Sequence, residues 1–337
     1  MYDVLIIGAG PGGIFSAYEL IRQNPQLKVG VFEAGHELNK RKCPIDGKKF
    51  KTCIGCKSCS IMSGFGGAGA FSDGKYNITN DFGGTLEEME QDYFRYQCEE
   101  TPLLSYQFGF HAEYTTSRNL MEGIAQLAGK YKKPVYVHCS ETKREVEECR
   151  EKTGMTPIAY MDSLGLFENG GGLFHGVHLD EADFDIMKKK KICVVTNPAS
   201  NLKLASGIAP VKTYLEKGIP VAIGTDGPAS NNCLDMFKEM FLVTGLQKVV
   251  HNDPEAVPAA DVLKMATVNG AYAMGLDNCD ILAEGKYADL IMIDLMQPNM
   301  QPIQNIEKNV VYSASKLNVK MTMINGRAVY QNGKFKI

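Results

Sequence analysis

Five polar side chains that could bind a metal ion and move protons each follow a short hydrophobic run. His138 and Glu141 stand three residues apart after the run PVYV, and Asp226 follows PVAIGT. His175 closes the run GGLF, and His111 closes LLSYQFGF. Imidazole and carboxylate groups in one site can hold a divalent cation, which lowers the pKa of bound water, and can transfer protons to a substrate. These residue types therefore indicate metal-assisted hydrolysis.

The hydrophobic runs have the pattern of buried strands, and the segments between them have the pattern of helices. In a parallel sheet built this way, the carboxyl ends of the strands meet at one edge, where a (β/α)₈ barrel places its active site. We count five such strands, followed by the run ADLIMID and a hairpin with its turn at Asn325–Gly326. The sequence predicts an α/β fold with an incomplete (β/α)₈ barrel and a C-terminal β element. The expected helices span roughly 117–131, 143–152, 157–163, 181–190, 211–217, 235–243, 262–266 and 269–275.

Several polar residues near the runs are expected to be structural. Alternation along a strand turns Cys139 away from the face that carries His138, so Cys139 is not expected to be a ligand. His178 is expected to be structural, and His251 to lie in a surface loop. We expect two asparagines to brace loops through bonds to the backbone, and a run of lysines to be a solvated helix end. These residues are Asn197, Asn201 and Lys188–Lys191.

A second motif lies at the start of the chain. The run VLII precedes Gly8, Gly10 and Gly13 in the pattern G-x-G-x-x-G, and a helical segment follows. Glu33 closes the next strand-like run, 20 positions after the last glycine. The glycines allow a tight turn and close approach to a pyrophosphate, and an acidic residue at this distance can accept a hydrogen bond from a ribose hydroxyl. The segment is therefore predicted to be a Rossmann-like βαβ fragment.

Cysteines and composition set further bounds. Cys53, Cys56 and Cys59, with Cys43 as a fourth, have the spacing of metal or iron–sulfur ligands. Reduced thiols in a loop are the alternative, and the spacing leaves both open. A net charge of −3 gives no reason to expect nucleic-acid or membrane binding, and a homo-oligomer is allowed. The N-terminus lacks the basic region of a signal peptide, so a cytoplasmic location is expected.

The first 84 residues resemble the uncharacterised FAD-dependent dehydrogenases of bacteria. The resemblance rests on the G-x-G-x-x-G start, the segment KRKCP, the cysteine-rich stretch and GFGGAGAFSDGK. It implies FAD, with its ADP half at Gly8, Gly10, Gly13 and Glu33. A flavoprotein of this kind needs further strands and a region that encloses the isoalloxazine, which we do not find after Gly84. The FAD site is therefore expected to be incomplete.

Residues from about 103 to the end resemble the amidohydrolase superfamily, and closely its 5′-methylthioadenosine/S-adenosylhomocysteine deaminases. The motifs are HAEYT, HCSET, HGVHL, NPASNLKLASGIAP, GTDGPASNN and AEGKYADLIMID. The resemblance implies hydrolytic deamination of a purine nucleoside. His138 and Asp226 would be metal ligands, zinc being the expected metal, and Asp226 would also take a proton from the attacking water. Glu141 would shuttle protons to the purine ring, His175 would contact the water or the tetrahedral centre, and His111 would contact the nucleoside. Glu141 and Asp226 thus also count as substrate-binding residues.

The family's H-x-H metal motif is absent from this sequence. A catalytic zinc usually needs three protein ligands, so two ligands predict weak metal binding and impaired turnover. A flavin oxidoreductase and an inactive fusion of two gene fragments are the alternatives. We expect a Rossmann-like fragment at 1–84, a junction helix at 85–102, a partial barrel at 103–285 and a C-terminal β-sandwich segment at 286–337.

Overall fold

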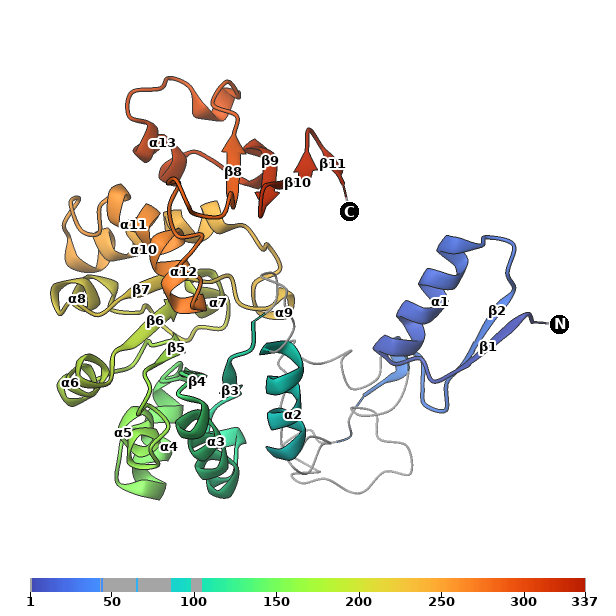
Figure 1. Ribbon diagram of the computed structural model, residues 1–337, viewed down its shortest axis with the longest axis horizontal. Helices are drawn as coiled ribbons and strands as arrows, with labels where there is room; N and C mark the ends of the chain where they lie inside the picture. Colours follow the sequence, from blue (N-terminus) through green and yellow to red (C-terminus); the bar gives the residue numbers. More distant parts are fainter. Residues whose placement is uncertain (1, 43, 45–64, 66–85, 98–104, 337) are drawn as a thin grey trace. The chain divides into compact units, whose positions relative to one another are not determined.

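The structure is a computed structural model that describes residues 2–42, 44, 65, 86–97 and 105–336. The chain divides into two compact units, Met1–Lys75 and Tyr76–Ile337, and each is described by itself (Figure 1). The expected cysteine ligands Cys43, Cys53, Cys56 and Cys59 lie outside the described residues. In the parts of the chain that are described, no helix combines the length and the apolar character needed to cross a membrane.

The first unit is a small βαβ arrangement. Strands β1 (Val4–Ile7) and β2 (Val29–Phe32) pair in parallel, and α1 (Pro11–Gln23) connects them. The 3₁₀-helix η1 (Leu38–Lys40) follows. The helix begins three residues before the expected start because Pro11 occupies its first turn, where a proline loses no hydrogen bond. The predicted strand–turn–helix–strand order is therefore what the structure has in this unit.

The second unit is built on a five-stranded parallel sheet in the order β3-β4-β5-β6-β7. Its strands follow the order of the chain, so each returns beside the one before it, as in a TIM-type α/β fold. β3 and β7 form the edges of this sheet among the described residues. That the barrel is incomplete stays a prediction. The strands are β3 (Phe108–Phe110), β4 (Val135–Cys139), β5 (Gly171–His175), β6 (Ile192–Thr196) and β7 (Val221–Ile223).

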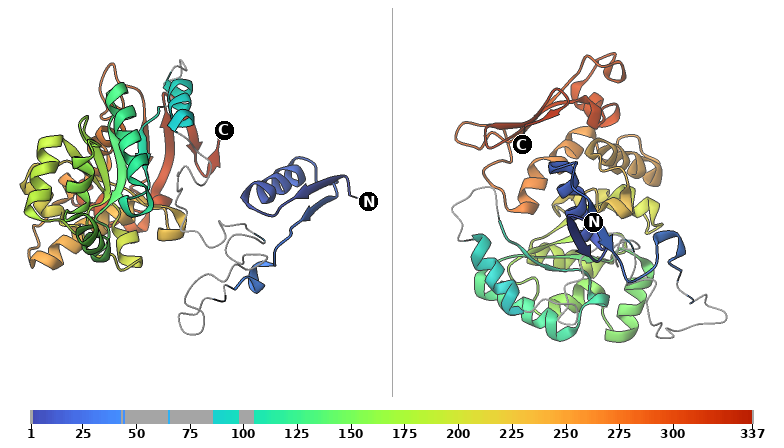
Figure 2. Two further views of the ribbon diagram at one scale, coloured as in Figure 1. Left: turned by 90° about the horizontal axis from the view of Figure 1, so that it is seen from below. Right: turned by 90° about the vertical axis from the view of Figure 1, so that its right-hand side faces the viewer.

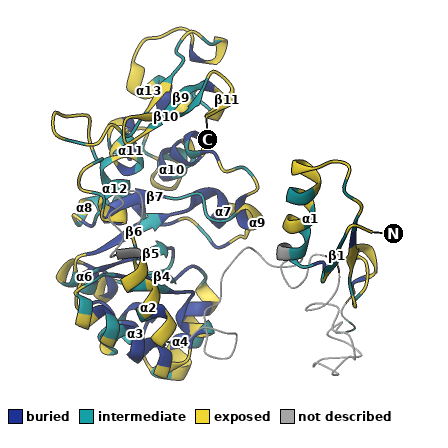
Figure 3. Cartoon of the chain, turned by 45° about the vertical axis from the view of Figure 1, so that its right-hand side comes forward, coloured by how far each residue is buried: buried dark blue, intermediate teal, exposed yellow. Residues whose placement is uncertain are grey.

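Helices cover the outer face of the sheet (Figure 2). Val135, Val137 and Cys139 of β4 are fully buried, whereas Tyr136 and His138 face the other way. This alternation confirms that Cys139 points away from the side of His138. Figure 3 shows the strands largely buried and the outer sides of the helices exposed. The helices before β7 are α2 (Leu86–Gln97), α3 (Arg118–Tyr131), α4 (Lys143–Thr153), α5 (Pro157–Ser163), α6 (Glu181–Lys190), α7 (Pro198–Lys203) and α8 (Val211–Glu216), with the 3₁₀-helix η3 (Glu113–Thr115).

Side-chain caps explain where the main helices begin. Ser117 accepts a hydrogen bond from the amide of Leu120 at the start of α3. Thr142 and Glu145 form a capping box at the start of α4, and Asp180 and Asp183 form another at the start of α6. These local signals lie in the sequence itself, which is why the predicted starts agree with the structure.

The last third of the unit contains the largest difference from prediction. Helix α10 (Met236–His251) was expected to end at 243, and His251 was expected in a loop. His251 is exposed, as expected, but it is the last residue of the helix. The helix continues because Thr244 donates to the carbonyl of Val257 and Gln247 donates to that of Ala209, which are bonds between distant segments.

The remaining elements complete the unit. α11 (Ala259–Ala266) and α12 (Val268–Met274) pack against β7, and α9 (Pro228–Asn231) follows β7 in the chain. The C-terminal sheet is antiparallel in the order β11-β10-β9-β8, and its predicted turn at Asn325–Gly326 has positive φ at both residues. It contains β8 (Leu290–Ile293), β9 (Val319–Ile324), β10 (Arg327–Gln331) and β11 (Lys334–Phe335), with η4 (Pro298–Met300), α13 (Ile306–Tyr312) and η5 (Lys316–Asn318) between β8 and β9.

Candidate active site

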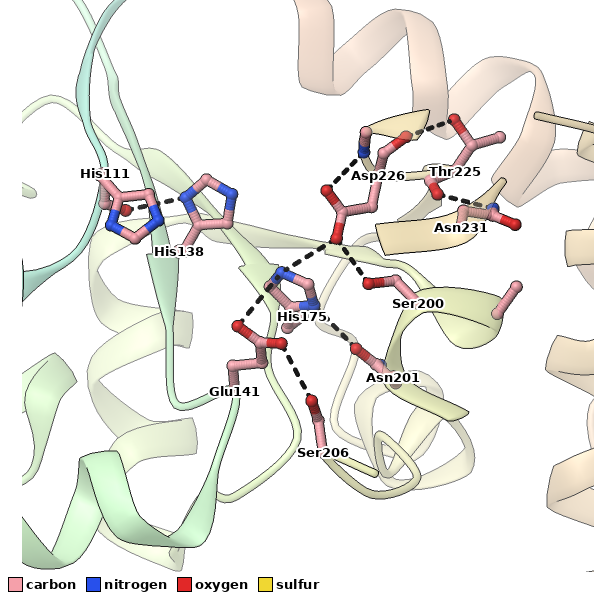
Figure 4. A network of polar contacts seen from close by, with 12 residues as sticks. His111, His138, Glu141, His175, Ser200, Asn201, Ser206, Thr225, Asp226 and Asn231 are labelled. Carbon is pink, nitrogen blue, oxygen red and sulfur yellow. Dashed lines mark hydrogen bonds and ion pairs between the residues drawn. The ribbon is translucent and has the colours of Figure 1, made fainter. Parts of the chain in front are cut away.

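His175, the last residue of β5, lies at the centre of the predicted site (Figure 4). Its ring is fully buried, and Nδ1 lies 2.7 Å from Oδ1 of Asn201. Nε2 lies 3.7 Å from Oε2 of Glu141 and 3.9 Å from Oδ2 of Asp226. Nε2 makes no hydrogen bond with any described residue. A buried imidazole nitrogen between two carboxylates is therefore free to contact a substrate or water.

Glu141 approaches His175 from the turn that follows β4. Its Oε1 accepts a hydrogen bond from the hydroxyl of Ser206 at 2.9 Å, and the side chain is almost completely buried. The turn itself is held by Glu145, whose carboxylate accepts from the amides of Ser140, Glu141 and Thr142 at 2.6, 2.8 and 3.4 Å. The capping carboxylate of α4 therefore fixes the backbone that carries Glu141.

Asp226 approaches from the end of β7. Oδ2 accepts from the Ser200 hydroxyl at 2.6 Å, and Oδ1 accepts from the amide of Gly227 at 2.5 Å. Burial alone would raise the pKa of this carboxyl. The hydrogen bonds from Ser200 and Gly227, together with the imidazoles of His175 and His138, outweigh burial and hold the pKa of Asp226 below its ordinary value. Asp226 is therefore ionised at neutral pH and able to bind a cation.

His138 and His111 occupy the third side of the cluster. His138 Nδ1 lies 2.8 Å from the carbonyl of His111, and the two rings are 4.8 Å apart between centroids. The centroids of His138 and His175 are 5.5 Å apart. His111 Nδ1 lies 2.9 Å from the hydroxyl of Thr115. The structure thus brings all five predicted residues of the second unit into one cluster.

Two residues of the cluster, and Ser140 directly before Glu141, have left-handed backbone conformations that residues other than glycine rarely adopt. The φ angles are 52° at Ser140, 74° at His175 and 59° at Asp226. Each lies where the chain leaves a strand of the sheet. Such conformations cost free energy, of order 1–3 kcal/mol each, and are typical of functional sites in a rigid scaffold. The backbone is therefore bent to aim these groups inward.

The donors do not form a complete metal site. Across the described part of the chain, no group of three or more His, Cys, Asp or Glu residues is arranged to hold a metal ion. His138 and Asp226 were the two ligands expected from the sequence, which stays a prediction, and a catalytic zinc ion usually requires three. The cluster can therefore exchange protons as it stands, whereas a tightly held metal would need another donor.

The sequence prediction missed the residues that position the cluster. Asn201 was expected to brace a loop through the backbone, but its side chain bonds His175, 26 positions away in the chain. Ser200 and Ser206 were not considered, although both are buried and bond the two carboxylates. His178 is structural as expected: Nε2 contacts the carbonyl of Ser206 at 2.7 Å. The sequence signal for these positioning residues was the group of small polar residues in NPASNLKLASG, a segment that contains α7.

The Ser206 hydroxyl gives a direct test of this positioning. Replacing Ser206 by alanine removes the hydrogen bond to Glu141 and should lower kcat/KM for the reaction of this site by about three- to thirtyfold, the value of one buried hydrogen bond. Ser163→Ala, which removes an exposed hydroxyl bonded to Tyr160, is the control. Equal activity of both variants would show that Ser206 does not position Glu141.

The glycine motif of the first unit forms the predicted turn. Gly8 has a φ of +99°, and a Cβ on Gly13 would lie 1.9 Å from the carbonyl oxygen of Gly8, so close packing requires glycine there. Gly10 has open space where a Cβ would be. Glu33 accepts from the amides of Ala9 and Gly35 at 2.7 and 2.8 Å. All four predicted residues therefore lie at one turn, with the Glu33 carboxylate bonded to the backbone.

Comparison with known proteins shows which family the second unit matches. Residues 80–329 match the amidohydrolase family. The chain is 40% identical over 267 residues to a 5-methylthioadenosine/S-adenosylhomocysteine deaminase from Dictyoglomus thermophilum. The aligned region covers 79% of this chain and 63% of the relative. It is also 41% identical over 229 residues to a 5′-deoxyadenosine deaminase from Methanothermobacter thermautotrophicus. That alignment covers 68% of this chain and 53% of the relative. The chain thus spans less than two thirds of the length of these curated relatives.

A solved structure agrees with these relatives. The crystal structure of an adenosine deaminase from Xanthomonas campestris with bound zinc superposes with a TM-score of 0.71 at 35% sequence identity. The match covers 74% of this chain and 57% of the solved chain. The matched part of this chain therefore has a fold similar to that of the solved protein.

Proposed function

Because this chain belongs to the amidohydrolase family, we propose that it hydrolytically deaminates adenosine-type nucleosides, at a rate reduced by its incomplete set of metal ligands. The observation that supports this most is the meeting of Glu141, His175 and Asp226, with both carboxylates within 4 Å of one unpartnered imidazole nitrogen. Relatives whose names state 5-methylthioadenosine, S-adenosylhomocysteine or 5′-deoxyadenosine as substrate support the nucleoside class.

The residues present can perform the proton transfers of this reaction. Water adds to the purine carbon that bears the amino group. The carbon–nitrogen bond then breaks, ammonia departs, and an oxo purine remains. Asp226 is ionised and held by Ser200, so its carboxylate can take a proton from the attacking water, and this proton then leaves on the amino group as ammonia. Glu141 carries a proton to the purine ring, and His175 Nε2 contacts the tetrahedral centre. His111 lies at the margin of the cluster beside His138, where it can contact the nucleoside.

A divalent metal would supply acidity to the attacking water, and zinc is named in the related solved structure. His138 and Asp226 are the two groups that could bind it, and they do not make a site by themselves. We therefore assign no step to the metal. After dialysis, the protein is expected to hold well below one zinc per chain, about 0.1 or less, by elemental analysis. One zinc per chain, lost in His138→Ala, would contradict this expectation.

The experiment that tests the proposal is a deamination assay on the purified full chain. Adenosine, 5′-methylthioadenosine and S-adenosylhomocysteine are each followed by the change in purine absorbance and by ammonia release, with and without added zinc. Slow turnover that disappears in Asp226→Asn supports the proposal. No product from any of the three nucleosides under either condition would overturn it.

We also propose that residues 1–84 are a dinucleotide-binding fragment of separate origin, joined at 85–102 to a partial barrel at 103–285 and a β-sandwich segment at 286–337. The glycine turn at Gly8 and the close packing at Gly13 support the first part. FAD bound there would be released on denaturation and detected by its absorbance. Protein without flavin that also binds no added FAD would exclude a flavin oxidoreductase.

One long genomic read across codons 80–105 tests whether the two parts are fused in one gene.

A further inference from the structure

A second cavity lies at the opposite end of the sheet from His175. It has a volume of about 610 Å³, within the usual range for small-molecule sites. Pro134, Gly170 and Lys191 in its lining directly precede β4, β5 and β6, whereas the candidate active site lies where strands end. His138 lies four positions after Pro134, which is about 13 Å along the strand. The cavity is therefore separate from the cluster around His175.

Lysines from the end of α6 give this cavity its charge. Lys189, Lys190 and Lys191 line it, and Glu168 is the one acid in the lining. Lys190 bonds Glu168 at 2.5 Å and Asp162 at 3.2 Å, so both nearby carboxylates share this one cation. Lys189 and Lys191 form no ion pair with any residue that the structure describes. Both side chains are exposed, so they can contact an anion that enters the cavity, in a chain whose net charge is −3.

Aromatic rings form the other walls. Tyr272 lines the cavity and is about half exposed. Tyr136 is fixed in the wall by a hydrogen bond from its hydroxyl to the carbonyl of Ala273. A Cβ on Gly172 would lie 2.3 Å from the ring of Tyr136, so a glycine at this position lets the ring lie against β5. A further cavity of about 230 Å³ shares Tyr272 and Lys191 and adds Lys188.

We propose that this cavity is a binding site for a small aromatic anion, with a phosphate or similar group on Lys189 and Lys191 and a planar ring on Tyr272. Lysine binds phosphate as a point charge, and the exposed face of a tyrosine ring accepts a planar ring by stacking. Two lysines of the run Lys188–Lys191, which was expected to be only a solvated helix end, would thus bind a ligand. The proposal does not depend on the deaminase activity.

The test is a fluorescence titration of the full chain with 1-naphthyl phosphate. The chain contains no tryptophan, so the naphthyl emission can be excited beyond the tyrosine band without interference. Saturable binding that weakens about tenfold in Lys189→Gln/Lys191→Gln and at raised salt is expected, because two charges are lost. Tyr272→Ser should weaken binding by a few-fold, since the ring contact is removed.

The matched control is Lys238→Gln/Lys308→Gln, which removes two charges from exposed helical positions outside both cavities. It should change the dissociation constant by less than about twofold. Inorganic phosphate should compete weakly, because it lacks the ring. The proposal is overturned if the probe does not saturate, if both double variants bind alike, or if inorganic phosphate binds as tightly as 1-naphthyl phosphate. Thermal melts of each variant confirm that the unit is folded.

Discussion

Replacing Glu141 by glutamine is expected to lower kcat/KM for deamination by about 10²- to 10⁴-fold, the usual contribution of a general acid or base. Glutamine keeps the shape of the side chain and can still accept from the Ser206 hydroxyl. It cannot carry a proton between water and the purine ring. The loss should therefore fall mainly on kcat, with a smaller change in KM.

Glu147→Gln is the control for this substitution. Glu147 lies on α4 with an exposed side chain, paired to Lys143 at 3.6 Å, so it shares the charge change but not the site. Its variant should have the activity of the parent protein within about twofold. If Glu141→Gln kept at least half of the activity, the assignment of proton transfer to Glu141 would be wrong.

The second large effect is expected at Glu145, whose carboxylate holds the turn that carries Glu141. Burial raises its pKa to about 7, although three backbone amides oppose that rise. In the unfolded chain its pKa should be near the ordinary value of about 4.3. A pKa that is raised by folding contributes stability below the unfolded value, and that contribution is lost as the pH rises through the folded value.

The sign of the pH dependence follows. Between pH 4 and pH 8 the unfolding free energy of the wild type should fall relative to that of Glu145→Gln by up to about 3 kcal/mol. Glutamine does not titrate, so the difference between the two proteins reports the titration of Glu145 and its coupling to Glu113. Urea unfolding at several pH values measures it. Glu151→Gln, an exposed position on the same helix, should show no pH-dependent difference.

A constant difference between wild type and Glu145→Gln across this range would contradict the raised pKa. Burial acts in the same direction on the carboxyls of Glu113, Asp183 and Glu239, whose pKa values are also raised. The contributions of Asp183 and Glu239 are common to both proteins and cancel, whereas Glu113 is electrostatically coupled to Glu145 and titrates together with it. The measurement therefore reports on the turn beside the candidate active site.

Local signals explain most of the agreement between the predicted and observed elements. Hydrophobic runs of four or five residues and the caps at Ser117, Thr142 and Asp180 lie within a few positions of the elements they specify. The extension of α10 to His251 was not predictable in this way, because it depends on bonds from Thr244 and Gln247 to other segments. Helices α7 and α9 were missed because helices this short have little periodicity to detect.

The sequence by itself determined which side chains could do chemistry, since His138, Glu141, His175 and Asp226 each lie at the end of a buried hydrophobic strand or within three residues after it. Only the tertiary structure decided how they are held. Parallel pairing brings the strand ends to one edge, and Ser200, Asn201 and Ser206 come from segments 26 to 65 positions away from their partners. No local pattern encodes such contacts, because they exist only after the sheet has formed.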